Sequence, residues 1–191
     1  GIFSQLFGVR LSGTEAIPEQ RFRLLQRVFE VNTVKADKVL MDALESGIQT
    51  RAGARIVGAE YQGTKAPLKE WEPKIWQEIY DYWQVCFNYL LLLLDRSDET
   101  SNRAKKIIGK SIRSFTLQGM IEMLDDVILK VINKTGIYWP EALDGIKTAI
   151  KYDSKEANED LNAALHKWLH LLTPENASLE DKIKIVVLNP P

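Results

Sequence analysis

The residue pattern that most resembles a reactive site is a pair of histidines, His166 and His170, the only two in the chain. Four residues apart on a helix, they share one face, and many metal sites use this spacing. A metalloprotease also needs a glutamate directly after the first histidine as its general base, and this chain has Lys167 there. The pair is therefore a candidate metal site without a protease signature, and we favour a solvated polar helix face as its interpretation.

A second candidate site is a run of cations that we call the basic ridge. It consists of Arg103, Lys106, Lys110 and Arg113. Spaced at i, i+3, i+7 and i+10, these residues would form one outward row on a helix. Such a row could contact the phosphates of a nucleic acid or of lipid headgroups. The row lacks aromatic neighbours for base stacking, and most charged rows on helices are simply solvated. Nucleic-acid contact is therefore an alternative function, ranked below a structural one.

The last four residues, Leu188-Asn189-Pro190-Pro191, resemble the start of the Asn-Pro-Pro-aromatic motif of amino-methylating DNA methyltransferases. In that family the asparagine side chain and a proline carbonyl hold the target amino group, and an aromatic ring stacks on the flipped base. The motif's aromatic residue has no counterpart here, and no Gly-rich cofactor loop follows a strand. The resemblance covers three residues, and it implies at most the helical part of a DNA-modifying enzyme whose active site lies outside this chain.

No other pattern in the chain is a specific catalytic signature. The segment 58–65, GAEYQGTK, is close to a phosphate-binding loop, but its lysine follows the threonine instead of preceding it. Adjacent carboxylates such as Asp125 and Asp126 point about 100° apart on a helix, so they form no catalytic pair. There is no Gly-x-Ser-x-Gly elbow. The sequence thus favours a non-catalytic role and predicts no cofactor.

The composition is that of an ordinary globular protein. Of the 191 residues, 45% are hydrophobic and 27% charged, and the formal net charge of −1 argues against a general polyanion binder. The single cysteine, Cys86, excludes an internal disulfide framework and a multi-cysteine zinc site. A lone cysteine among aromatic residues is typical of a buried side chain in a reducing compartment, so we expect a cytoplasmic protein.

The stretch Trp71–Leu94 is predicted to be the central helix of the fold. It carries three of the five tryptophans and ends in five consecutive leucines. Two apolar stripes, one starting at Ile75 and one at Trp76, cover nearly its whole circumference, so other helices should surround it. Its unbroken apolar run is much shorter than the roughly 20 residues that cross a bilayer, so we predict no membrane span.

Helix start and stop signals recur along the rest of the chain. Pro18 opens a first helix and Thr33 is a suitable N-cap for a second. Gly136 ends a later helix, and Asp153 with Glu156 resembles a capping box. The chain is therefore predicted to be all-α, either a multi-helix bundle or an irregular α-solenoid. One short C-terminal segment, 181–188, alternates like a strand.

These elements suggest three regions: an arm and two helices with a Gly-rich connector at 1–66, a main helical core at 67–176, and the strand-like tail at 177–191, which could begin a following domain. We expect a structural, regulatory or protein-interaction module within a larger intracellular protein. Its partner would be another protein or another domain of the same polypeptide. Exposed aromatic residues are the best anchors for a partner, and the sequence suggests Tyr138, Trp139 and the Phe3–Phe7 arm.

Overall fold

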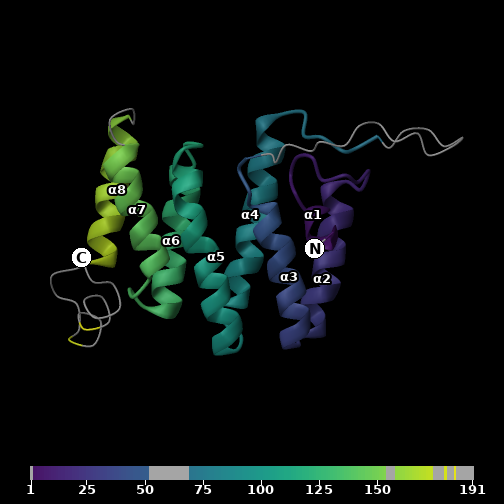
Figure 1. Ribbon diagram of the computed structural model, residues 1–191, viewed down its shortest axis with the longest axis horizontal. Helices are drawn as coiled ribbons and strands as arrows, with labels where there is room; N and C mark the ends of the chain where they lie inside the picture. The colour runs from purple at the N-terminus through teal and green to yellow at the C-terminus, as the bar shows by residue number, and fades with distance from the viewer. Residues whose placement is uncertain (1, 52–68, 154–157, 174–178, 180–182, 184–191) are drawn as a thin grey trace, which may run out of the picture. The chain divides into compact units, whose positions relative to one another are not determined.

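The computed structural model describes residues 2–51, 69–153 and 158–173, together with Leu179 and Ile183 (Figure 1). The described residues contain eight α-helices and no strand, which confirms the predicted all-α fold. The helices are α1 (Ile2–Gln5), α2 (Pro18–Val31), α3 (Val34–Gly47), α4 (Trp76–Leu93), α5 (Asp98–Thr116), α6 (Ile121–Thr135), α7 (Pro140–Tyr152) and α8 (Glu159–Leu172).

Several predicted features lie wholly or largely outside the described residues. Of the strand-like segment 181–188, only Ile183 is described, and it is helical, as is Leu179 just before the segment. The Gly-rich connector is described only as far as Arg51, so the phosphate-loop-like segment 58–65 lies outside. The Asn-Pro-Pro motif lies outside as well.

The chain divides into two compact units, Gly1–Tyr89 and Leu90–Pro191, and the division falls within α4. The first unit contains α1, α2, α3 and most of α4. The second contains the end of α4 and the helices α5 to α8.

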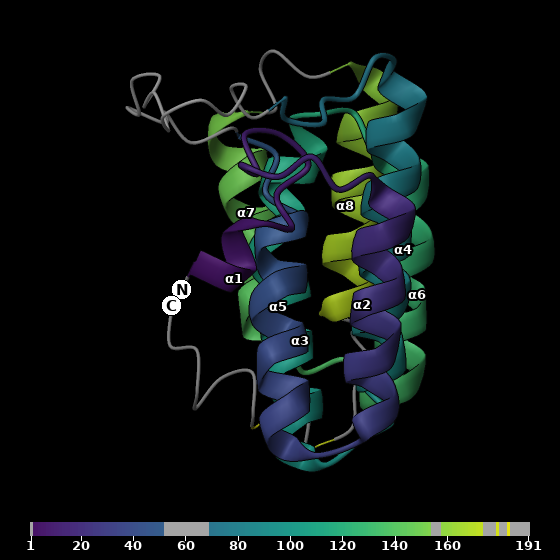
Figure 2. The same cartoon turned by 90° about the vertical axis from the view of Figure 1, so that its right-hand side faces the viewer.

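In the first unit, α2 and α3 form a tight antiparallel hairpin (Figure 2). Pro18 occupies the first turn of α2, as predicted. The helix ends where Asn32 adopts a left-handed conformation with φ of 50°, a state that asparagine tolerates well. Thr33 then caps α3, because its side-chain oxygen accepts a hydrogen bond from the Ala36 N–H at 3.3 Å. The predicted N-cap is therefore confirmed.

Helix α4 confirms that the stretch Trp71–Leu94 contains a helix, but the helix begins at Trp76 rather than at Trp71. Its buried residues include Tyr82, Trp83 and Cys86. One of the two predicted apolar stripes begins at Ile75, which was expected to be buried. That prediction was wrong for Ile75, which is 61% exposed. Periodicity assigns a residue to a helical face, but Ile75 precedes the first residue of α4, so the helical pattern does not apply to it.

Close contacts hold α4 against the arm and α3 in the first unit. The Tyr82 hydroxyl donates a hydrogen bond to the Phe7 carbonyl at 2.6 Å, and both residues are buried. Gly47, the last residue of α3, lies against Cys86, because a Cβ atom on that glycine would come within 2.8 Å of the Cys86 Sγ. Only a glycine at position 47 lets the two helices approach this closely.

A buried arginine organises the arm that precedes α2. The Arg21 guanidinium donates hydrogen bonds to the carbonyls of Gly8 and Ala16 at 2.9 and 2.7 Å, and to the Ser12 hydroxyl at 3.0 Å. Glu70 accepts hydrogen bonds from Ser12 and from the N–H of residue 13. A buried guanidinium is tolerated only when its donors are satisfied, and here the arm supplies the acceptors.

In the second unit, the helices α5 to α8 form two helical hairpins, α5 with α6 and α7 with α8 (Figure 1). Ser97 caps α5 by accepting a hydrogen bond from the Thr100 N–H. Gly136, with φ of 78°, follows the last residue of α6, as predicted. Asn158 caps α8 through a hydrogen bond from the Leu161 N–H at 2.8 Å.

The two hairpins of the second unit stack layer on layer, since α5 packs on α7 and α6 packs on α8. Lys106, near the middle of α5, lies beside Glu141 at the start of α7. Arg113, near the end of α5, contacts Asp153 directly after the end of α7. The two helices therefore run parallel. Stacked hairpins with parallel like helices are the arrangement of repeat units in α-solenoids. Both predicted architectures, the multi-helix bundle and the α-solenoid, allow this stacking of four helices in two layers.

Candidate functional site

Two glycines allow α5 and α7 to approach each other closely. A Cβ atom on Gly109 would lie 2.6 Å from the Trp139 Nε1 and 3.0 Å from the Ala142 N. Gly145 on α7 faces the Gly109 carbonyl across the same interface, where a Cβ would lie 3.5 Å away. This close packing sets the spacing between the two helices.

Trp139 belongs to this interface and not to a partner surface. Its side chain is only 2% exposed, and its Nε1 donates a hydrogen bond to the Lys105 carbonyl at 3.0 Å. The prediction that Trp139 is an exposed anchor was therefore wrong, because Gly109 opens a space on α5 that the indole ring fills. Tyr138 is half-buried, and its carbonyl accepts a hydrogen bond from the Lys105 ammonium at 2.7 Å. Neither residue has the exposure expected of a partner anchor.

The Phe3–Phe7 arm is split between surface and core. Phe7 is buried, whereas Phe3 is exposed at the arm's surface and contacts Phe7 with ring centroids 5.1 Å apart. The arm as a whole is therefore packed on its own unit, and only Phe3 remains as an exposed aromatic residue.

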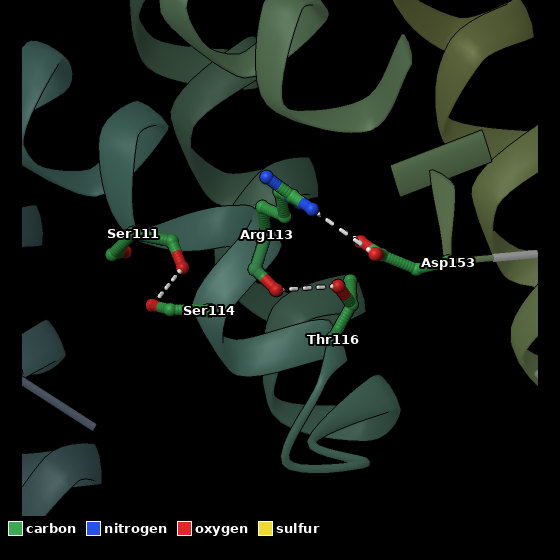
Figure 3. Close-up of polar contacts among 5 residues, drawn as sticks. All are labelled: Ser111, Arg113, Ser114, Thr116 and Asp153. Atoms are coloured by element: carbon green, nitrogen blue, oxygen red, sulfur yellow. Dashed lines mark hydrogen bonds and ion pairs between the residues drawn. The ribbon is translucent and has the colours of Figure 1, made fainter. Parts of the chain in front are cut away.

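The structure places two members of the basic ridge against carboxylates of α7. Arg113 makes a two-pronged contact with Asp153, with Nε and Nη2 at 2.9 and 3.1 Å from the carboxylate oxygens (Figure 3). Lys106 lies 4.0 Å from Glu141. The remaining members differ in exposure, since Lys110 is exposed and Arg103 half-buried.

The Arg113–Asp153 pair shifts the ionisation of both groups. The hydrogen bond to Asp153 raises the pKa of Arg113, and the same contact lowers the pKa of Asp153. Both charges are therefore held over the physiological pH range. Asp153 was predicted to begin a capping box, but it directly follows the last residue of α7 and binds a side chain of α5 instead.

An exposed aromatic side chain, which no pattern in the sequence indicated, lies beside this pair. Tyr152 is 61% exposed. Its ring centroid lies 6.0 Å from the Arg113 guanidinium and 5.1 Å from the Lys151 ammonium. Thirty-nine positions separate Arg113 from Tyr152 in the sequence. Only the parallel stacking of α5 and α7 brings them together, and no local pattern encodes that stacking.

One helical turn beyond Arg113, Leu117 is 48% exposed, and its N–H donates to the Arg113 carbonyl at 3.2 Å. We call the surface around this arginine the Arg113 patch. It consists of Lys110, Arg113, Leu117, Lys151 and Tyr152. It combines an exposed aromatic ring and an exposed aliphatic side chain with three cations, which is the composition of a recognition surface rather than of a catalytic site.

The hydroxyl groups near the patch are occupied within their own helix. Ser114 donates to the Ser111 carbonyl at 2.8 Å, and Thr116 donates to the Arg113 carbonyl at 2.7 Å (Figure 3). Such bonds to preceding carbonyls are common for serine and threonine in helices. Among the described residues no general base contacts these hydroxyls, so they have the geometry of helix packing and not of a nucleophile.

The two histidines lie exposed on α8, as expected for residues four apart on an outward face. Within the described part of the chain, no cluster of three or more histidine, cysteine, aspartate or glutamate side chains is placed to hold a metal ion. The pair thus offers two imidazole ligands at most, and a third would have to come from a residue outside the described ranges.

No helix in the described ranges is both long enough and apolar enough to cross a membrane. Comparisons with protein-family models, with curated proteins and with solved structures each find no significant match to this chain.

Proposed function

We propose that this chain is a non-catalytic protein-interaction module, and that its second unit presents the Arg113 patch to a protein partner. The observation that carries the proposal is the exposed ring of Tyr152, held beside a guanidinium that Asp153 fixes in place. Tyrosine and arginine are, with tryptophan, the residue types most enriched at binding hot spots. A prearranged arginine loses little side-chain freedom when a partner binds.

The stacked hairpins support the same proposal. In α-solenoids, the stacking of helical hairpins creates extended surfaces lined by like helices, and these surfaces bind partners. Here the like helices are α5 and α7, and the patch lies where both end. A regulatory role would follow if partner binding controlled another part of the same polypeptide.

Photo-crosslinking tests this proposal directly. Benzoylphenylalanine would be placed at position 152 in one variant and at Glu122, an exposed position near the start of α6, in a matched control. Irradiation in cells of the source organism should give a discrete protein adduct from position 152 but not from position 122. Adding Arg113→Ala should weaken that adduct. Identical adducts from both positions, or none from position 152, would contradict the proposal.

A second candidate function is contact with nucleic-acid phosphates, and one observation favours it. The basic ridge has no aromatic neighbour in the sequence, but folding places Tyr152 beside Arg113. An aromatic ring among cations is the combination that single-stranded nucleic-acid sites use. The test is fluorescence anisotropy of a labelled oligonucleotide, in which affinity should fall steeply with salt and after Lys106→Glu and Lys110→Glu.

A further inference from the structure

The charges around the Arg113 patch are only partly compensated. Arg113 and Lys106 have carboxylate partners on α7, namely Asp153 and Glu141. By contrast, Lys110 and Lys151 are exposed, and no carboxylate within the described ranges lies within 4.0 Å of either ammonium. Two cations of the patch are therefore available to an incoming ligand.

The uncompensated cations and the exposed apolar groups occur together. Lys110 precedes Arg113 by one turn on α5, and Leu117 follows it by one turn. On α7, Lys151 neighbours Tyr152 and lies 5.1 Å from its ring. A ligand that covers this surface must offer negative charge and also an apolar group for Leu117 and the tyrosine ring.

From this arrangement we propose that the Arg113 patch binds a short acidic segment of a partner protein. An apolar side chain of that segment would pack on Leu117 and Tyr152, and its carboxylates would lie near Lys110 and Lys151. Arg113 is already paired with Asp153, so it holds the tyrosine ring in place rather than serving as the main anion contact. This inference rests on the proposed interaction function and specifies the chemistry of the partner.

The same observations favour an acidic protein segment over a nucleic acid. Affinity for a nucleic-acid strand comes largely from neutralising several phosphates. Here, two of the four ridge cations already face carboxylates, and these carboxylates add negative charge to the same face. Leu117, an aliphatic side chain, suits a protein side chain better than it suits a base. The net charge of −1 gives no long-range attraction for a polyanion.

The test is selection from a phage-displayed library of random 12-residue peptides on the immobilised full chain. A double variant, Lys110→Glu with Lys151→Glu, removes the two available cations. A control double variant, Lys35→Glu with Lys38→Glu, makes the same charge change at exposed lysines of α3. All three proteins should show the same helical content by circular dichroism. Peptides that bind the parent and the control but not the patch variant should be acidic and carry at least one large apolar residue.

The consensus peptide would then be synthesised with a fluorescent label and measured by anisotropy. We expect its Kd to rise at least about tenfold for the patch variant and less than about twofold for the control, because charge reversal turns attraction into repulsion. A matched peptide in which every glutamate and aspartate is replaced by its amide should bind about as weakly to the parent as the acidic peptide binds to the patch variant.

Each other result overturns a specific part of the inference. Patch-dependent peptides that are neutral or basic would leave the interaction function standing and refute the acidic partner. An amide peptide that binds as tightly as the acidic one would do the same. Unlabelled peptide and a 20-nucleotide oligothymidine would be compared as competitors of the labelled peptide. Displacement by the oligothymidine at the lower concentration would identify a nucleic acid as the ligand. Selection without any patch-dependent peptide, combined with a specific crosslink at position 152, would show that the partner is recognised by different chemistry.

Discussion

Trp168 on α8 donates its indole N–H to the Asp125 carboxylate on α6 over 2.9 Å. The indole ring is completely buried, and this bond satisfies its one polar atom. The Lys167 ammonium contacts the same carboxylate, at 2.8 and 2.9 Å from its two oxygens. One carboxylate at the edge of the core thus ties together the second helices of the two stacked hairpins.

Removing this carboxylate should destabilise the second unit. We expect Asp125→Ala to lower the free energy of unfolding by about 1–3 kcal/mol, because it leaves a buried indole donor without its acceptor. Asp125→Asn keeps an acceptor oxygen and should cost less than about 1 kcal/mol. Urea denaturation followed by far-ultraviolet circular dichroism measures both. Equal losses for the two variants would show that the charge, and not the bond to Trp168, provides the stabilisation.

The free energy of unfolding should decrease at acid pH. Burial raises the pKa of Asp125, but the hydrogen bonds from Lys167 and Trp168 together outweigh it, so the pKa lies below its ordinary value. The hydrogen bond from Arg113 lowers the pKa of Asp153. A carboxyl whose pKa is lower in the folded state contributes its full stabilisation above the unfolded pKa of about 3.9, and loses it as the pH falls through the folded value.

The melting temperature should therefore drop as the pH is lowered from about 5 to below 4, and the drop should be smaller in the double variant Asp125→Asn with Asp153→Asn. Both carboxylates are partly exposed, so salt should reduce the effect. Differential scanning fluorimetry across this pH range, at low and high salt, checks the prediction. A double variant with the same acid slope as the parent would assign that slope to other groups.

Arg21 should be essential to the first unit. It is 4% exposed, and its guanidinium bonds to the carbonyls of Gly8 and Ala16 and to the Ser12 hydroxyl. Arg21→Lys keeps the charge but cannot reproduce this planar set of donors, so we expect a loss of about 2–4 kcal/mol. The control Arg23→Lys changes an exposed position and should stay within about 0.5 kcal/mol of the parent. Thermal denaturation of both variants distinguishes them, and equal melting temperatures would refute the prediction.

Cys86 should report on the opening of the first unit. The thiol is fully buried, and that burial raises its pKa well above the ordinary value. Thiolate is the reactive form, so both access and ionisation protect the native cysteine. We expect its reaction with an aromatic disulfide reagent at pH 8 to be at least about a thousandfold slower in buffer than in guanidinium chloride. Rapid labelling of the native chain would mean that α4 and α3 separate readily.

The sequence was sufficient for the features that depend on local chemistry. Pro18 at the start of α2, Thr33 as the cap of α3 and Gly136 after α6 all occur where they were predicted. Each is a residue whose side chain or backbone freedom decides a helix end without help from distant parts of the chain. The helix within Trp71–Leu94 was also predicted, since its apolar residues recur at helical spacing.

The candidate site could not be predicted, because it depends on which helices pack together. Periodicity shows which face of a helix is buried but not which neighbour buries it. Trp139 was expected at the surface, and it is buried because Gly109 on a different helix leaves room for its ring. Tyr152 was passed over, and it gains significance only when Arg113 lies beside it. Both errors arise from the same parallel packing of α5 on α7.

The two glycines at that interface allow its closeness to be tested with a matched pair of substitutions. A Cβ on Gly109 would lie 2.6 Å from the Trp139 Nε1 and 3.0 Å from a backbone nitrogen, so Gly109→Ala should force α5 and α7 apart at a cost of about 1–3 kcal/mol. This cost opposes the gain of about 1 kcal/mol that alanine usually brings to a helix interior.

Gly145→Ala makes the same chemical change on the facing helix, but its Cβ would meet atoms no closer than 3.5 Å. The gain in helix propensity should therefore dominate, and the variant should be slightly more stable than the parent. Chemical denaturation of the two variants should thus give free-energy changes of opposite sign, and the loss of Trp139 packing in Gly109→Ala should also shift the tryptophan fluorescence spectrum. If both variants gained stability, the interface would be looser than the structure shows, and the positions of Arg113 and Tyr152 relative to each other would no longer be fixed by it.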